Sequence, residues 1–162
     1  MTFEGSCINT QRLLRGYRDF WGEYNPLAIA RLDKLCNLDC FVPRFFHAPR
    51  NAAESMAGNS YLTYNLKIPP GSWIWCFDSL TVSNMVLQIT DIGLNHKWFS
   101  SPVPSNLLQS SATADGPRPN YFPAPYPVVD PGVFVVEIWN TSPDTNRCQV
   151  TLAAVVPKDA CV

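Results

Sequence analysis

From residue 61 onward, short apolar stretches alternate with turns rich in proline and glycine, and this rhythm constrains the fold more than any other feature. YLTYNLKI (61–68) alternates apolar and polar side chains with a period of two, as a strand with one buried face does. PPG and DPG mark sharp turns before the apolar stretches that follow them. Further strands are expected at SWIWCF, NMVLQITDIG, HKWFSS, 121–128, FVVEIWN and CQVTLAAVVP. Short strands separated in this way predict a mainly β fold, an antiparallel β-sandwich or jelly roll, rather than an α/β fold.

Residues 1–58 lack this alternation and are expected to form an extended N-terminal arm. One short helix is predicted at about residues 10–22, because apolar side chains recur there at the spacing of one helix face. These side chains are Leu13, Tyr17, Phe20 and Trp21. The stretch after it is apolar but interrupted by prolines, so one long regular element cannot run through it. We therefore predict an arm at 1–58, which lies on the following domain or on another chain, and a β-sandwich domain at 59–162.

The segment 101–131 is expected to be a long loop of that domain, because it holds eight of the fifteen prolines. Loops of this length in a compact domain are usually functional or held by a partner.

Composition excludes several classes of partner. Only 15% of the residues are charged, below the roughly 25% usual for soluble domains, which suits a chain that is covered by neighbours. A net charge of −1 gives no general attraction to nucleic acid or to an anionic membrane. The sequence contains no run of about 18 apolar residues, so no transmembrane helix is predicted. The first 26 residues do not resemble a signal peptide. The chain is expected to be made and used in a cytoplasm, or released from one by lysis.

The six cysteines are expected to be thiols, since no secretory signal is recognised. Cys76 and Cys148 lie in apolar strand patterns and are interpreted as small core residues. Cys36, Cys40 and His47 have suitable chemistry for zinc, but their spacing differs from that of structural zinc sites. No metal and no cofactor is therefore predicted.

No catalytic residue is predicted, because the only histidines, His47 and His96, lie in no recognisable nucleophile motif. Asp78, Asp91 and Glu137 are interpreted as turn-capping or solvent-facing residues.

The strand WIWCF (73–77) is apolar on both faces. Successive side chains of a strand point in opposite directions, so Trp73, Trp75 and Phe77 are expected on one face and Ile74 and Cys76 on the other. Each ring covers roughly 150 Å² or more, and burial contributes about 25 cal/mol per Å², so an uncovered row costs several kcal/mol. We expect the arm, in cis or from a neighbour, to cover this row, which makes an assembly interface. Its predicted residues are Leu13, Tyr17, Phe20, Trp21, Trp73, Trp75 and Phe77.

An alternative hypothesis is a carbohydrate-binding adhesion or receptor-binding module, because apolar sugar faces dock on exposed rings. Its predicted ligand-facing residues are Trp98, Tyr121, Phe122 and Tyr126.

The order of these features resembles that of small structural proteins of tailed-phage virions, namely head-decoration, head-fibre or minor capsid proteins. The resemblance rests on an arm followed by LKIPPGSWIW, MVLQITDIGLNHKWFSSPVPSNLL, YFPAPYPVVDPGVFVVEIWN and CQVTLAAVVP, about residues 60–157. It implies a non-enzymatic bacteriophage protein with a jelly-roll or β-sandwich body. It also implies binding to other virion proteins, the major capsid or connector subunits, and a homo-oligomer with three-fold or another cyclic symmetry. Such a protein is made in the host cytoplasm and resides in the virion. No functional residue is carried over.

Overall fold

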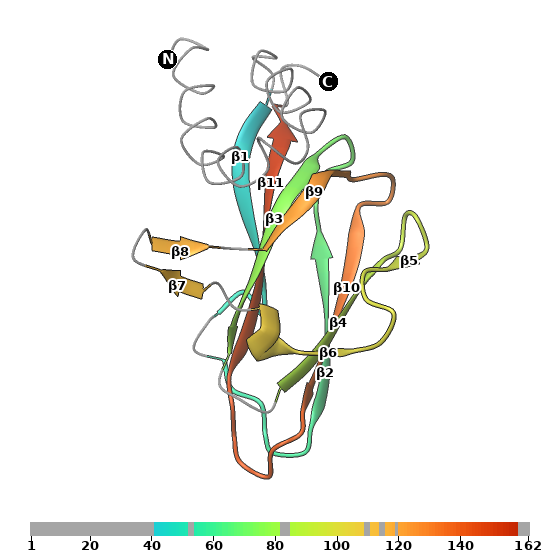
Figure 1. The fold of residues 1–162 in the computed structure, drawn as a ribbon. Coiled ribbons are helices and arrows are strands. Elements are labelled where there is room, and N and C mark those ends of the chain that lie inside the picture. Colours follow the sequence, from blue (N-terminus) through green and yellow to red (C-terminus); the bar gives the residue numbers. More distant parts are fainter. Residues whose placement is uncertain are drawn as a thin grey trace.

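The computed structural model of the chain describes residues 41–51, 54–81, 85–108, 111–113, 116–118 and 120–158 (Figure 1). The predicted helix at about residues 10–22 and its four interface residues lie outside these ranges, as do Cys36 and Cys40. The strands are β1 (Phe41–Ala48), β2 (Tyr61–Lys67), β3 (Trp73–Thr81), β4 (Met85–Asp91), β5 (His96–Lys97), β6 (Val103–Pro104), β7 (Ser111–Thr113), β8 (Gly116–Arg118), β9 (Asn120–Pro127), β10 (Val133–Asn140) and β11 (Cys148–Pro157). A short 3₁₀ helix, η1 (Ser105–Leu108), follows β6.

The strands form two facing antiparallel sheets and one small hairpin. The first sheet has the order β1-β11-β3-β9, and the second has the order β2-β10-β4-β5, with β6 also paired to β4. β7 and β8 form the hairpin. The pairs are nested along the chain, because β1 pairs with β11, β2 with β10, β3 with β9 and β4 with β5. This nesting is the topology of a jelly roll, so the predicted fold class is confirmed.

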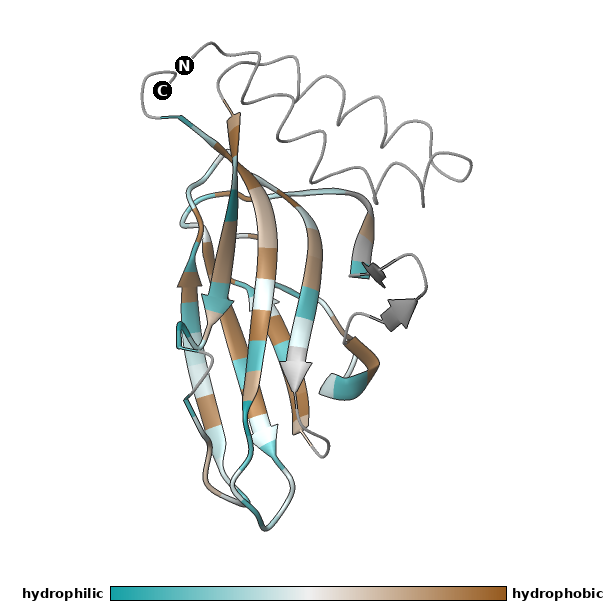
Figure 2. Cartoon of the chain, turned by 90° about the vertical axis from the view of Figure 1, so that its left-hand side faces the viewer, coloured by the Kyte–Doolittle hydropathy of each residue, from teal (hydrophilic) through white to brown (hydrophobic). Residues whose placement is uncertain are grey.

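The core lies between the two sheets and follows from the period-two pattern. Along β10 half-buried and buried residues alternate over all eight positions. Its inward residues Phe134, Val136 and Ile138 are fully buried, and they share one core cluster with Leu152 of β11 and Ile89 of β4. The same alternation is visible along the strands as brown segments between paler ones (Figure 2).

Two proline-glycine turns meet at one end of the sandwich. Gly71 and Gly132 have φ angles of 85° and 68°, a backbone region that glycine adopts readily. The amide of Ile68 donates to the carbonyl of Gly132 at 2.8 Å, and the amide of Gly71 donates to Val128 at 2.9 Å. A Cβ atom on Gly132 would lie 2.0 Å from the Ile68 carbonyl oxygen. The predicted PPG and DPG turns are therefore present, and they are bonded to each other.

At the opposite end, the side chain of Asn140 joins three segments. It is 2% exposed, and its Nδ2 donates to the carbonyl oxygens of Met56, Ala57 and Asp144 at 3.3, 2.9 and 2.9 Å. Its Oδ1 accepts from the Ser142 amide at 3.1 Å and from Asn146 Nδ2 at 3.2 Å. The end of β10, the segment before β2 and the β10–β11 turn are thus held by one residue.

The predicted boundary at residue 58 differs from the structure. Residues 41–48 form β1, an edge strand that pairs with β11 over its whole length, from Phe41 with Pro157 to Ala48 with Val150. The prolines of this region suggested a broken arm, but an edge strand tolerates a residue such as Pro43 that cannot donate a hydrogen bond. Among the described residues, the first sheet therefore already includes β1, and an arm stays a prediction for the residues before it.

The predicted alternation along β3 is wrong at one point. Ile74 and Cys76 pair with consecutive residues of β11, so Trp75 is the extra residue of a β-bulge. The extra residue moves Phe77 to the same side as Ile74, and both contact the core. Trp73, Trp75 and Phe77 therefore do not share one face.

The segment 101–131 contains more regular structure than a single long loop. β6, η1, the β7–β8 hairpin and β9 all lie in it, and β9 agrees with the strand predicted at 121–128. The strand predicted at HKWFSS is limited to His96 and Lys97.

Candidate functional site

The face of the first sheet that points away from the core carries buried apolar residues. Trp75 and Cys76 of β3 are each 5% exposed, and Ala153 and Val155 of β11 are 3% and 1% exposed. None of the four belongs to the core cluster between the sheets. Cys76 and Ala153 are cross-strand partners, so they lie on the same face. We refer to Trp75, Cys76, Ala153 and Val155 as the outer apolar face.

The pKa of the Cys76 thiol reflects the exclusion of water from the outer apolar face. Burial raises this pKa above the ordinary range, and the negative charge of Asp78 adds to the effect. A buried thiol of this kind is inert toward reagents that need a thiolate. Cys76 and Cys148 are not in disulfides. Cys148 belongs to the core cluster as predicted, whereas Cys76 belongs to the outer apolar face.

Three of the four residues predicted to face a ligand, namely Trp98, Phe122 and Tyr126, pack against one another. The ring centroids of Trp98 and Phe122 are 5.0 Å apart, and those of Trp98 and Tyr126 are 5.3 Å apart. Trp98 also packs edge-on against Phe134 of the core at 5.6 Å. Of Tyr121 the structure describes the backbone, which pairs with Cys76. These three rings pack against the core and cover it at one side of the sandwich. The carbohydrate hypothesis stays a prediction.

Asp91 and Tyr126 fix this aromatic cluster. Tyr126 donates its hydroxyl hydrogen to Asp91 Oδ2 at 2.8 Å, and Asp91 Oδ1 accepts from the amides of Gly93 and Leu94 at 2.8 and 3.3 Å. Asp91 is 1% exposed. Burial and the bond to Asp91 raise the pKa of Tyr126 to about 12. The interpretation of Asp91 as a turn-capping residue is confirmed, and it joins the β4–β5 turn to β9.

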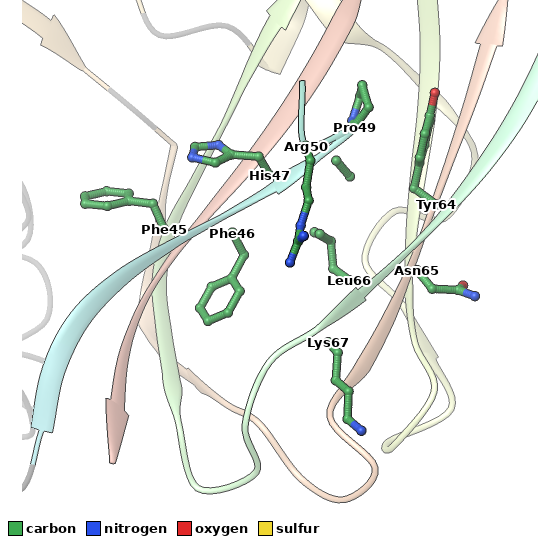
Figure 3. A pocket seen from close by; sticks show the side chains of 10 residues that line it. Phe45, Phe46, His47, Pro49, Arg50, Tyr64, Asn65, Leu66 and Lys67 are labelled. Carbon is green, nitrogen blue, oxygen red and sulfur yellow. The ribbon is translucent and has the colours of Figure 1, made fainter. Parts of the chain in front are cut away.

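The other side of the sandwich is open, and a groove of about 550 Å³ lies there between β1 and β2. Figure 3 shows the Arg50 side chain lying between Phe46 and Leu66, with Lys67 beyond them. Tyr64 lines the groove from β2, and its hydroxyl donates to Glu54 Oε1 at 3.3 Å. The groove therefore combines apolar walls with two cations.

The two histidines do not come together with a nucleophile and an acid. His47 Nδ1 and Thr151 Oγ1 are 2.9 Å apart across the β1–β11 pair. His96 lies exposed on β5. Glu137 on β10 accepts a hydrogen bond from the Tyr61 hydroxyl at 2.8 Å. Across the described ranges, no group of three or more His, Cys, Asp and Glu residues is placed to hold a metal ion.

Sequence reasoning missed Arg50, Lys67 and Asn140. Arg50 and Lys67 are separated by the β1–β2 connection and belong to no motif, so only the topology brings them to one groove. Asn140-Thr141-Ser142 matches the N-glycosylation sequon, a pattern that gives no sign of the internal hydrogen bonds that the Asn140 side chain amide makes.

Comparison with known proteins gives little further information. No protein-family model matches the chain, and no curated protein matches it. Among solved structures, a chain of the capsid asymmetric unit of the cyanophage Pam1 has 13% sequence identity and a TM-score of 0.44. The alignment covers 73% of this chain and 87% of that chain. In the described part of this chain, no helix has the length and apolar character to cross a membrane.

Proposed function

We propose that the chain is a non-enzymatic structural component of a tailed-phage virion, of the minor capsid or decoration type. In this proposal, residues 1–40 anchor the protein to adjacent subunits, and the jelly roll adds contacts that stabilise the shell. Its partners are major capsid or connector subunits and further copies of itself in a cyclic oligomer, such as a trimer. The order of sequence features and the jelly-roll fold, which is common among viral coat proteins, support this role.

The burial of the outer apolar face is the observation that carries the proposal. Trp75 alone has an indole that covers roughly 200 Å², so covering it contributes about 5 kcal/mol at 25 cal/mol per Å². A single sandwich needs only one apolar face on each sheet, so a second apolar face calls for a further layer. We assign that layer to the apolar residues of the predicted arm, contributed in cis or exchanged with a neighbour.

Deletion of residues 1–40 tests this assignment, because the reactivity of the Cys76 and Cys148 thiols can be compared before and after the deletion. Labelling with a thiol reagent, followed residue by residue by mass spectrometry, is expected to speed up roughly tenfold or more at Cys76, which the deletion exposes. Cys148 lies in the core between the sheets and serves as the internal control, because its labelling rate should not change. The truncated chain is also expected to lose incorporation into particles.

Two results would contradict the proposal. If Cys76 remains as slow as Cys148 after the deletion, the arm does not cover the outer apolar face. If the truncated chain still enters particles at the level of the full chain, the arm is not the anchor. The native mass of the full chain, measured beside that of the truncated one, shows whether the arm also joins copies.

A further inference from the structure

The outer face of the second sheet carries an exposed pair of aromatic rings. Tyr61 of β2 and Trp139 of β10 are cross-strand partners, so both side chains stand on the same face of the sheet. That face is the outer one, because Ile138, the chain neighbour of Trp139, points into the core. Tyr61 is 48% exposed, and Trp139 is half-buried. Exposed apolar patches with polar groups at their rim are typical of binding sites.

Two contacts hold the Tyr61 ring in a fixed position. Its centroid lies 5.0 Å from that of Trp139, with an angle of 31° between the ring planes. Its hydroxyl donates to Glu137 Oε1 at 2.8 Å. A side chain that is already ordered loses little conformational entropy when a ligand covers it. The two rings therefore form a preformed platform.

Hydrogen-bonding groups lie beside the rings on the same face. Glu137 is two residues before Trp139 on β10, and its cross-strand partner Thr63 is two residues after Tyr61 on β2. Thr63 is exposed, and Glu137 is half-buried. The Tyr61 hydroxyl bonds to Oε1, so Oε2 of the carboxylate can accept from a ligand. A ligand that fits has an apolar face for the rings and hydroxyl groups at its rim for Glu137 and Thr63.

We propose that this face binds a neutral, β-1,4-linked chain of glucose or N-acetylglucosamine units. These sugars carry their large substituents equatorially, so each ring has a face of C–H groups, and the linkage keeps successive units in a flat ribbon. The C–H groups carry a small positive charge, which the negative face of an aromatic ring attracts. Hydroxyl groups at the rim donate to the Glu137 carboxylate in charge-assisted hydrogen bonds. The negative charge of Glu137 disfavours acidic sugars.

The Glu137 carboxylate favours a sugar over a protein partner at this face. The centre of a protein interface is depleted of charged residues, because a carboxylate that is buried there without a partner is costly. A sugar instead supplies hydroxyl donors to the carboxylate and leaves the rest of the group in water. This inference goes beyond the structural role and does not depend on the arm, because the outer apolar face belongs to the first sheet and these rings to the second.

The test titrates the full chain with cellohexaose, with chitohexaose and with a hexamer of β-1,4-linked glucuronic acid, and follows the chemical shifts of backbone amides. At least one neutral hexamer is expected to bind and to shift the amides of β2 and β10. The glucuronic acid hexamer has the linkage of cellohexaose but a carboxylate on each unit, so it is expected to bind roughly tenfold more weakly. Tyr61→Ala should weaken binding of the neutral hexamer roughly tenfold. Glu137→Gln keeps an acceptor for the Tyr61 hydroxyl and should remove most of the discrimination against the acidic hexamer.

Phe45→Ala serves as the matched control, because Phe45 is a ring of similar exposure, 49%, on β1 of the first sheet. It should leave the affinity unchanged. The proposal is overturned if neither neutral hexamer binds, if the acidic hexamer binds as tightly, or if the shifts lie away from β2 and β10. A fall in native mass on Tyr61→Ala, with no sugar bound by the unmodified chain, would identify the rings as a contact between copies and equally overturn it. None of these results would affect the assignment of the arm.

Discussion

Replacement of Asn140 by alanine tests whether one buried side chain holds one end of the jelly roll together. The substitution removes the two Nδ2 hydrogens, which three carbonyl oxygens share, and the Oδ1 atom, which accepts two hydrogen bonds. Some of the partners keep another bond, because the Met56 carbonyl still accepts from the Asn146 amide. The Ser142 amide loses its Oδ1 acceptor, and Ser142 is 7% exposed, so water reaches it poorly.

The magnitude follows from the groups left without partners. A buried donor or acceptor without a partner costs about 1–3 kcal/mol, and the removed amide also leaves a small void. The expected loss in the free energy of unfolding is therefore about 2–4 kcal/mol. Urea lowers that free energy by about 1–3 kcal/mol per molar for small proteins, so the unfolding midpoint should fall by roughly 1–2 M.

Urea unfolding followed by tryptophan fluorescence measures this shift. Asn65→Ala is the matched control, because Asn65 is an exposed asparagine of β2 whose side chain has no hydrogen bond to another described residue. Its replacement should change stability by less than about 0.5 kcal/mol. If Asn140→Ala costs no more than Asn65→Ala, the network at this end does not stabilise the fold as we describe. The same network predicts that the sequon is a poor glycosylation acceptor in the folded chain, because Nδ2 is buried and bonded.

Two further predictions concern the opposite end of the sandwich. Gly132→Ala should destabilise the protein by several kcal/mol more than Gly71→Ala in urea unfolding. Both glycines have positive φ, but only a Cβ on Gly132 meets the Ile68 carbonyl, at 2.0 Å, and equal losses would contradict the role of this close approach. The second prediction concerns alkaline pH. Because the folded state raises the pKa of Tyr126 to about 12, its contribution to stability is complete below about pH 10 and is lost as the pH rises through 12. Tyr126→Phe should therefore flatten the fall in urea midpoint between pH 10 and pH 12, and an unchanged slope would contradict this reasoning.

The strands of the domain could be predicted from the sequence because period-two alternation and proline-glycine turns are local signals. β10 has a strict alternation, and its boundaries agree well with FVVEIWN. β1 was missed for a physical reason, since prolines exclude central strands but not edges, and the sequence does not show which strand will be an edge.

The residues of the candidate sites could not be predicted from the period-two pattern, because their positions depend on strand register and on topology. The bulge at Trp75 adds one residue to β3, and only the register with β11 reveals it. The alternative hypothesis placed Trp98 and Tyr126 at a ligand, and their spacing in the sequence could not show that they pack against the core at one side of the sandwich. Arg50 and Lys67 line the same groove only because the fold brings β1 and β2 together. No local sequence pattern predicts that these two residues lie near each other.

The pairing of Phe41 with Pro157 has a consequence for how the domain can be connected. Within the described residues, the first and the last strand of the sandwich meet at this pair, on neighbouring strands that lie about 5 Å apart. The segments that precede β1 and follow β11 therefore leave the first sheet side by side. The turn between β10 and β11, which the hydrogen bonds of Asn140 hold, lies at the opposite end of the sandwich from these two segments and would face away from whatever they attach to.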